Sequence, residues 1–321
     1  MKVLITGGAG FVGSHLVDAH VAAGDDVVVV DDLSTGRLEN IGAHVAAGRV
    51  RFQQGKAEDP AVLDAAFQGA ELVYHLAAAV GVFQILQHPL QSIRTNLDAS
   101  SAIFERAAAG GIRTVFTSTS EVYGKNVSDA LNEGDDTIYG STKVHRWLYA
   151  VSKATDEFLA LAHHQERGLP VTVVRLFNTT GPRQTGAYGM VVPRFVRQAL
   201  EGQPLTVYGD GSQLRCFTNV HDVVAALMAL AATPASIGDV VNVGNPREIS
   251  IGDLAVLVCK IVGSRSPVEL IDYESAYGKG FEDMRRRVPD VSRLRGLVGF
   301  VPTTPLEETI KEIAAYIAPG R

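Results

Sequence analysis

The apolar residues of this chain form short continuous runs that alternate with longer amphipathic segments. Six runs have the length of strands: Val3–Thr6, Val27–Val30, Val50–Gln53, Leu72–His75, Arg113–Ser118 and Val171–Leu176. Four segments between them repeat their apolar residues at helical spacing: Val12–Ala23, Pro60–Phe67, Asn96–Ala109 and Ala150–Arg167. Continuously apolar strands that alternate with helices are typical of a parallel sheet covered on both faces. The pattern therefore predicts an α/β fold with a doubly wound parallel sheet.

The pattern changes near residue 178, where Gly and Pro become frequent and the apolar segments shorten. We expect residues 1–177 to form the sheet domain and residues 178–321 to form mainly a smaller substrate-binding lobe. One later strand and helix, Val240–Val243 and Ile251–Val262, are expected to return to the main sheet. Because no linker or low-complexity tract separates the two halves, we expect them to share one cleft.

Composition and charge narrow the possible partners. The chain has 321 residues and a formal net charge of −6, and its densest basic cluster is the isolated run Arg285-Arg286-Arg287. A nucleic-acid partner is therefore not expected. No segment has the apolar length of a membrane helix or a signal peptide. The two cysteines, Cys216 and Cys259, lack the spacing of a metal site or a disulfide framework, which favours the cytoplasm.

The first strand leads into a glycine-rich turn. Residues 1–13 read MKVLITGGAGFVG, so Gly7, Gly10 and Gly13 follow a buried strand and open an amphipathic helix. In such a turn, glycines allow a tight bend, a close approach of backbone to a pyrophosphate and close packing of helix on sheet. The helix N-terminus adds amide groups and a dipole for the phosphates. This context predicts a dinucleotide site in a Rossmann-type fold.

An acid after the second strand indicates which dinucleotide binds. Asp31 lies 18 residues after the last glycine of the turn, where a carboxylate accepts hydrogen bonds from the adenosine ribose and repels a 2′-phosphate. Arg37 lies close enough in sequence to meet such a phosphate, but Asp31 and Asp32 would oppose it. We therefore predict NAD rather than NADP as the cofactor.

Candidate catalytic residues follow in two places. Residues 149–153 read YAVSK, which places Tyr149 and Lys153 on one face of a helix. A nearby ammonium group lowers the pKa of a tyrosine and makes it a usable base. The segment TSTSEVYG (117–124) lies at the carboxyl end of the fifth strand, where open α/β sheets bind ligands. There Thr119 or Ser120 is expected to bond a sugar oxygen, and Glu121 is a candidate acid or base.

Further motifs are HLAA (75–78), Asn96, RLFNTTGPRQ (175–184), PLTVYGDGSQLRCF (204–217) and RRRVPD (285–290). With TGGAGFVGSHL, TSEVYG and YAVSK, they make the chain resemble the extended short-chain dehydrogenase/reductase family over essentially its whole length. That family comprises NAD-dependent nucleotide-sugar epimerases, dehydratases and decarboxylases.

The resemblance implies a set of binding residues. The cofactor is expected to contact Gly7, Gly10, Phe11, Val12, Gly13, Asp31, Asp32, Ser34, Gly36, Leu76, Ala77, Ala78, Asn96, Tyr149 and Lys153. A UDP-sugar is expected to contact Asn178, Val192, Tyr208, Arg215 and Arg287, with the two arginines gripping the diphosphate. The chain departs from the family at Lys56, where many relatives carry an Asp that meets adenine. That contact is expected to pass to Glu58 or Asp59.

The resemblance also implies a 4-keto-sugar intermediate, because Tyr149 would take the proton of the sugar 4-hydroxyl while NAD takes the hydride. UDP-glucuronate decarboxylases are the most similar group. They share the Thr119-Ser120-Glu121 triplet, the approach Arg146-Trp147-Leu148-Tyr149 and the segment 277–290 with Arg287, which aligns with an active-site arginine. A 4-ketone turns a uronate into a β-keto acid that loses carbon dioxide readily, so we expect decarboxylation of UDP-glucuronate.

Three alternatives remain open. Residues 178–193 resemble 4-epimerases of UDP-hexoses or UDP-glucuronate equally well, although epimerases often carry Ser or Thr where Glu121 stands. A 4,6-dehydratase usually has an Asp where Ser120 stands. A non-catalytic NAD-binding scaffold would not need the intact Tyr149 and Lys153. The resemblance further implies a homodimer, formed through the helices Ser92–Ala109 and Ala150–Arg167.

Overall fold

The protein is described by a computed structural model over residues 1–79, 88–186, 190–272, 284 and 286–318. Residues 277–283 and Arg285, which belong to the decarboxylase-like segment, lie outside these residues. A central sheet of seven parallel strands has the order β11-β6-β5-β4-β1-β2-β3. The strands are β1 (Lys2–Thr6), β2 (Asp26–Asp31), β3 (Val50–Gln54), β4 (Leu72–His75), β5 (Arg113–Thr119), β6 (Val171–Leu176) and β11 (Val240–Val243).

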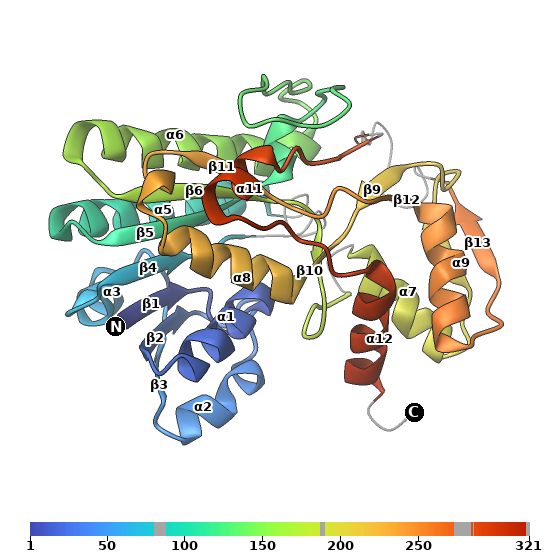
Figure 1. The fold of residues 1–321 in the computed structure, drawn as a ribbon, viewed down its shortest axis with the longest axis horizontal. Helices are drawn as coiled ribbons and strands as arrows, with labels where there is room; N and C mark the ends of the chain where they lie inside the picture. Colours follow the sequence, from blue (N-terminus) through green and yellow to red (C-terminus); the bar gives the residue numbers. More distant parts are fainter. Residues whose placement is uncertain (80–87, 187–189, 273–283, 285, 319–321) are drawn as a thin grey trace.

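Helices cover both faces of this sheet (Figure 1). Successive side chains of a strand point to opposite faces, and β1 places Val3 and Ile5 in one buried cluster and Leu4 in the other. The first cluster is covered by α1 (Phe11–Ala22), α8 (Val220–Ala231) and α11 (Ser292–Val298). The second is covered by α3 (Pro60–Phe67), α5 (Pro89–Gly110) and α6 (Leu148–Arg167). The predicted doubly wound fold is therefore confirmed.

The six predicted strands form within a residue of their expected bounds, but one helix is longer than expected. The segment expected over Asn96–Ala109 belongs to α5, which begins at Pro89 and ends at Gly110. Pro89 suits the first turn of a helix because its missing N–H has no helical partner there. Gly111 then ends the helix in a left-handed conformation with φ of 61°.

A smaller lobe packs beside the carboxyl edge of the sheet (Figure 1). It contains α7 (Val191–Leu200), α9 (Ile251–Val262), α12 (Leu306–Ile317), the strand pair β8 (Leu205–Tyr208) and β13 (Val268–Ile271), and the pair β9 (Leu214–Cys216) and β12 (Glu248–Ser250). Two short paired strands, β7 (Thr179–Thr180) and β10 (Thr218–Asn219), connect this lobe to the sheet. Short elements complete the chain: α2 (Gly42–Ala46), η1 (Leu38–Asn40), η2 (Ser120–Tyr123), η3 (His145–Trp147) and η4 (Pro234–Ser236).

The later strand and helix that were expected to return to the sheet separate instead. Strand β11 joins the sheet edge in register with β6, as predicted. Helix α9 does not follow it, because its buried residues Leu254, Ala255 and Val258 pack in a third cluster with Val192 and Phe195 of α7. Apolar spacing defined this helix correctly but did not indicate which surface it would cover.

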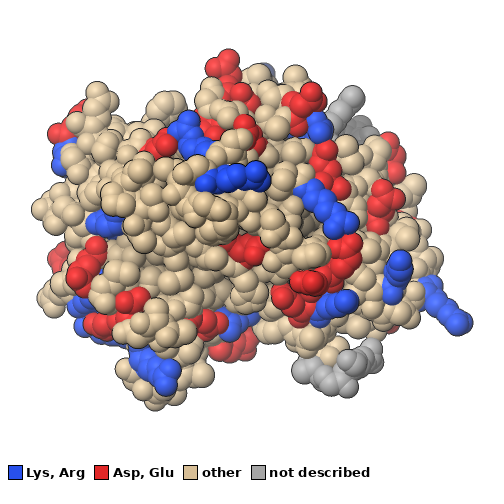
Figure 2. All heavy atoms as spheres, in the orientation of Figure 1, with Lys and Arg blue, Asp and Glu red and all other residues tan. Residues whose placement is uncertain are grey.

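Charged side chains are interspersed on the face of the molecule shown in Figure 2, with acidic and basic groups over both lobes. None of the helices in the described part of the chain is long and apolar enough to cross a membrane. Cys216 and Cys259 are both free thiols.

Candidate active site

A cavity of about 580 Å³ opens at the carboxyl ends of β1, β4, β5 and β6 and extends into the smaller lobe. The strand order reverses between β1 and β4, which is where open α/β sheets bind ligands. Most of the predicted site residues line the cavity: Gly7, Gly10, Phe11, Val12, Gly13, Asp31, Asp32, Ser34, Leu76, Ala77, Ala78, Thr119, Ser120, Glu121, Tyr149, Asn178, Val192, Tyr208, Arg215 and Arg287. Gly36, Asn96 and Lys153 do not.

The glycine turn has no room for side chains. A Cβ on Gly13 would lie 2.1 Å from the Gly7 carbonyl oxygen, and one on Gly7, whose φ is +72°, would lie 2.8 Å from the Ala77 nitrogen. Gly10 is the N-cap residue of α1 and has no side chain that could accept a hydrogen bond. The first N–H groups of the helix therefore have no capping side chain. This turn therefore fits a pyrophosphate group.

Asp31 ends β2 at the adenosine end of the cavity. Its carboxylate accepts hydrogen bonds from the backbone N–H groups of Ala9 and Leu33, each at 2.9 Å. Gly36 packs against this carboxylate, since a Cβ there would lie 2.7 Å from Oδ1. Arg37, the residue that would have favoured a 2′-phosphate, pairs instead with Glu39 at the surface. The residues present therefore fit NAD.

The segment after β3 contains the residues that were expected near adenine. Lys56, Ala57 and Glu58 line the cavity, whereas Asp59 does not. The Asp59 carboxylate instead accepts a hydrogen bond from the Ala61 N–H at 2.9 Å and caps α3. Of the two acids expected near adenine, only Glu58 is placed to serve.

Asn96 lies behind the cavity wall rather than on it. The buried amide accepts a hydrogen bond from the Ala79 N–H at 2.8 Å and donates one to Ser152 Oγ at 3.1 Å. It thereby connects the loop after β4 to helix α6. It supports this loop, and its contact with the cofactor stays a prediction.

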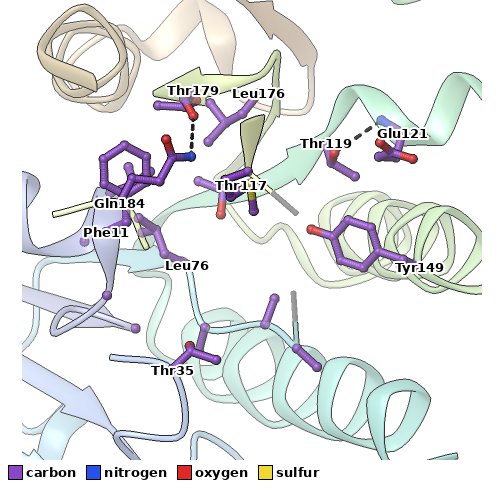
Figure 3. A pocket seen from close by; sticks show the side chains of 18 of the residues that line it. Phe11, Thr35, Leu76, Thr117, Thr119, Glu121, Tyr149, Leu176, Thr179 and Gln184 are labelled. Atoms are coloured by element: carbon purple, nitrogen blue, oxygen red, sulfur yellow. Dashed lines mark hydrogen bonds between the residues drawn. The ribbon is translucent and has the colours of Figure 1, made fainter. Parts of the chain in front are cut away.

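Tyr149 projects from the first turn of α6 into the cavity, with its hydroxyl toward the end of β5 that carries Thr117 and Thr119 (Figure 3). Burial and the nearby carboxylates of Glu121 and Asp156 raise the pKa of Tyr149 well above its ordinary value. The pKa of Tyr149 is therefore raised, not lowered as expected from a neighbouring ammonium group.

Lys153 explains this difference. Its Nζ lies 3.4 Å from Asp156 Oδ2 and 3.9 Å from the centre of the Phe116 ring, and only 2% of its side chain is exposed. Burial lowers the pKa of Lys153, while Asp156 acts in the opposite direction. The positive charge of Lys153 is thus shared with a carboxylate that the sequence did not single out.

Glu121 is held between two arginines. Its carboxylate accepts from Arg146 Nη1 at 2.6 Å and pairs with Arg287 Nη2 at 2.7 Å. All three side chains are largely buried, with 15%, 7% and 6% of Glu121, Arg146 and Arg287 exposed. Burial alone would raise the pKa of Glu121, but the Arg287 and Arg146 guanidinium groups hold it well below its usual range. Glu121 is therefore a stable carboxylate.

Arg287 lies at this sugar end of the cavity. Besides Glu121, it contacts Asn178 Oδ1 at 3.3 Å, and its buried Nε has no hydrogen-bond acceptor among the described residues. Asn178 has a φ of +30°, an uncommon backbone conformation that marks a strained position. Its side chain donates to the Cys216 carbonyl oxygen and so connects β6 to β9.

The smaller lobe adds a second polar wall. Val192 begins α7 beside the cavity, and Tyr208 ends β8 with the Arg194 guanidinium carbon 4.3 Å from its ring centre. Arg215, which is 8% exposed, also lines the cavity. Arg146 was named only as part of the approach to Tyr149, with no role of its own, and Arg194 was missed, because neither belongs to a spacing that carries chemistry by itself.

The family model described as "NAD dependent epimerase/dehydratase family" matches residues 3–244. The chain is 38% identical to a UDP-N-acetyl-alpha-D-glucosaminuronate decarboxylase of Bacillus cytotoxicus, over 97% of this chain and 96% of that protein. It is 34% identical to UDP-glucuronic acid decarboxylase 1 of Danio rerio, over 99% of this chain and 72% of that protein.

Two solved structures are 4-epimerases with the same fold. The UDP-glucose 4-epimerase of Thermotoga maritima is 30% identical with a TM-score of 0.89, and the alignment covers 99% and 98% of the two chains. The UDP-glucuronic acid 4-epimerase of Bacillus cereus, solved with UDP-glucuronic acid and NAD, is 29% identical with a TM-score of 0.88 and 99% coverage of both. The resemblance found in the sequence is confirmed: this chain belongs to the NAD-dependent epimerase/dehydratase family, whose members act on nucleotide sugars.

Proposed function

We propose that this enzyme decarboxylates a UDP-hexuronate through a 4-keto intermediate. The observation that carries the proposal is the buried group of Glu121, Arg146 and Arg287 in the cavity that Tyr149 enters. Arginine binds carboxylates through charge-assisted hydrogen bonds. Arg287 lines the cavity, so its guanidinium group is the cation that a sugar carboxylate would meet there.

Each residue near the sugar has a proposed role in the oxidation at C4 and the decarboxylation that follows. Tyr149 accepts the proton of the sugar 4-hydroxyl, and Thr119 or Ser120 donates a hydrogen bond to the same oxygen. NAD held at the glycine turn would supply the hydride acceptor for C4. Because the resulting ketone stands β to the sugar carboxylate, the C5–C6 bond breaks and carbon dioxide leaves while the electron pair forms the C4–C5 enolate. Protonation of C5 then gives the 4-keto pentose, and return of the hydride to C4 would complete a turnover without net oxidation.

The second lobe is proposed to hold the nucleoside diphosphate. Arg215 supplies a buried guanidinium for the phosphates, and Val192 stands at the N-terminal turn of α7, where N–H groups favour anions. Tyr208 with its stacked Arg194 offers a flat surface for the base. Arg287 is assigned to the sugar rather than the diphosphate, because it pairs with Glu121.

The state of Glu121 favours decarboxylation over dehydration. Removal of water across C5 and C6 needs a base for the C5 proton, and a carboxylate whose pKa two arginines hold far below its usual range is a weak base. Epimerisation of a neutral hexose needs no buried arginine beside the sugar. The remaining alternative is 4-epimerisation of the same hexuronate, the reaction for which the Bacillus cereus enzyme is named.

The sugar is proposed to be glucuronate or its 2-acetamido derivative, since the two curated relatives above are named for these two substrates. The experiment incubates the NAD-loaded enzyme separately with UDP-glucuronate, UDP-N-acetylglucosaminuronate and UDP-glucose. Release of carbon dioxide is expected from one or both hexuronates, with a product about 44 mass units lighter than the substrate when the hydride returns to C4, or about 46 units lighter when the 4-ketone is released. A product of unchanged mass from a hexuronate would instead assign 4-epimerisation.

The catalytic assignment has its own test. Tyr149→Phe removes the hydroxyl that accepts the proton and should lower kcat by at least about 100-fold, the usual size of a general-base contribution. The variant should still bind NAD, because the ring remains in place. Product formation at the parent rate would refute the role of Tyr149.

A homodimer is proposed on the outer surface of α6. Val151, Thr155, Phe158 and Ala162 recur on one exposed face of this helix, and Phe158 is 75% exposed. An apolar face of this kind is typical of an interaction site. Phe158→Asp should convert a dimer to a monomer in light scattering, while Val256→Asp, at an equally exposed apolar site on α9, should not. A wild-type monomer would exclude the proposal.

We further propose that the enzyme works in the cytoplasm, since both cysteines are free and one is fully buried. Fractionation of cells that express the full chain tests this location.

A further inference from the structure

Helix α6 carries a second buried acid whose role the proposed reaction does not explain. Asp156 lies one turn beyond Lys153 and is 0% exposed. Apart from the 3.4 Å ion pair with Lys153, neither of its oxygens has a hydrogen bond of good geometry within the described residues. Its neighbour Glu157 is fully partnered by contrast, by Arg175 at 2.7 Å and by Ser118 at 2.5 Å. A buried carboxylate with so few partners is costly.

The surroundings of Asp156 leave Lys153 as its main electrostatic partner. From α5, Ser100 lowers the pKa of Asp156, and burial raises it. The Ser100 hydroxyl also contacts His75, whose pKa burial lowers to about 3, so this imidazole is neutral near pH 7. The negative charge of Glu157 is matched by Arg175 of β6.

Asp156 acts on both members of the catalytic pair. Lys153 is buried against the Phe116 ring of β5, where an ammonium group without an anion would lose its proton readily. Tyr149 faces the carboxylates of Asp156 and Glu121, and Glu121 is already held by its two arginines. Asp156 therefore differs from Glu121 and Glu157. Among the described residues it has no arginine partner, so its negative charge acts directly on the Tyr149–Lys153 pair.

We propose that Asp156 is a positioning residue that keeps Lys153 charged and sets the pH at which the Tyr149–Lys153 pair releases its proton. The inference rests on the roles proposed above for Tyr149 and Lys153. Two interacting groups titrate as one system. With Asp156 ionised, loss of one proton changes the net charge of Tyr149, Lys153 and Asp156 together from 0 to −1. With a neutral residue at position 156, the same step changes it from +1 to 0. Removal of this fixed anion therefore makes release of the proton easier, whichever member of the pair loses it.

The test is the nearly isosteric variant Asp156→Asn, with kcat/KM for the hexuronate that is turned over measured from pH 5 to 10. The acid limb of the profile reports release of the proton from the pair, and it should move to lower pH by about one unit or more, the usual effect of one close charge. The matched control is Glu166→Gln, which removes an exposed carboxylate near the end of the same helix and should leave the limb in place.

A second measurement needs no turnover. The phenolate absorbance of Tyr149 is obtained by subtracting the pH titration of a protein with Tyr149→Phe from that of the same protein with Tyr149. In the Asp156→Asn background this absorbance should appear at lower pH than in the wild-type background. If Asp156→Asn does not fold, Asp156→Ser serves instead, because it removes the same negative charge and should move the limb in the same direction.

An acid limb and a phenolate titration that stay in place in a folded Asp156→Asn protein would overturn the inference, even if the melting temperature changed. A shift of both to higher pH would overturn it as well. Failure of the proposed function is recognised separately, because full activity of Tyr149→Phe contradicts the catalytic pair itself. The inference stands if the limb moves down while Tyr149→Phe is inactive.

Discussion

Replacement of Arg287 by methionine distinguishes the two ligands that this side chain could serve. The sequence resemblance implied a grip on the diphosphate, whereas the structure pairs Arg287 with Glu121 at the sugar end of the cavity. Methionine retains most of the apolar stem and removes only the guanidinium group. Arg146 still holds Glu121 at 2.6 Å, so the carboxylate is not left unpaired.

The expected loss follows from the number of bonds at stake. Arg287 pairs with Glu121 and contacts Asn178, and the residue also lines the cavity, so one charged hydrogen bond to the sugar carboxylate is the interaction at stake. A hydrogen bond between charged groups contributes about 1.5–3 kcal/mol. Loss of about 2–3 kcal/mol corresponds to roughly 30–150-fold weaker binding. UDP-glucose has no carboxylate, so its Kd should change by less than about threefold if no bond is lost.

The assay is calorimetric titration of the NAD-loaded protein with UDP-glucuronate and with UDP-glucose. Arg286→Met is a matched control, because the neighbouring arginine pairs with Glu248 and Asp129 and its side chain is 37% exposed. This control should bind both ligands like the wild type. Equal weakening of both ligands by Arg287→Met would refute the reasoning and return Arg287 to the diphosphate.

Three further predictions concern the cofactor turn and stability. Gly13→Ala should abolish NAD binding in a calorimetric titration, because its Cβ would meet the Gly7 carbonyl oxygen at 2.1 Å; Gly42→Ala, which meets open space, should bind NAD normally. Burial lowers the pKa of His15 from 6.5 to about 4, so the unfolded chain binds the proton first as the pH falls. The stabilisation from neutral His15 is complete above about pH 6.5, and about 2 kcal/mol of the free energy of unfolding should be lost by pH 5. In denaturant titrations, the His15→Asn variant should lose less of its free energy of unfolding over the same pH interval. Phe104→Ala, at a fully buried ring, should cost about 3–5 kcal/mol in the same assay; a cost below 1 kcal/mol would contradict its place in the core.

The sequence predicted most of what local pattern determines. Apolar runs marked the strands because buried parallel strands need apolar residues on both faces. Gly7 and Gly13 were identified because the turn leaves no room for a Cβ, a demand that the residue type itself reveals. Tyr149 and Glu121 were placed at the cavity because the carboxyl ends of parallel strands meet at one edge of the sheet.

Contacts between distant segments could not be predicted in this way. Arg146 reaches Glu121 across 25 residues, and only the folded chain brings them to 2.6 Å. Asn96 was identified as a family motif, yet its side-chain amide lies behind the cavity wall and forms hydrogen bonds with Ala79 and Ser152. Asp156 looked like any polar residue of an amphipathic helix until its complete burial was seen.

The position of β11 has a consequence for how the chain is made. Val240 pairs with Val173, so 67 residues separate a β6 residue from its partner at the sheet edge. At about 5–20 residues per second, a ribosome takes roughly 3–13 s to supply that partner. During this interval the open side of β6 in the nascent chain is an unpaired strand edge, which favours pairing with other chains. A fragment that ends at residue 177 would keep this edge permanently and would also lack α8 and α11, which cover one face of the sheet.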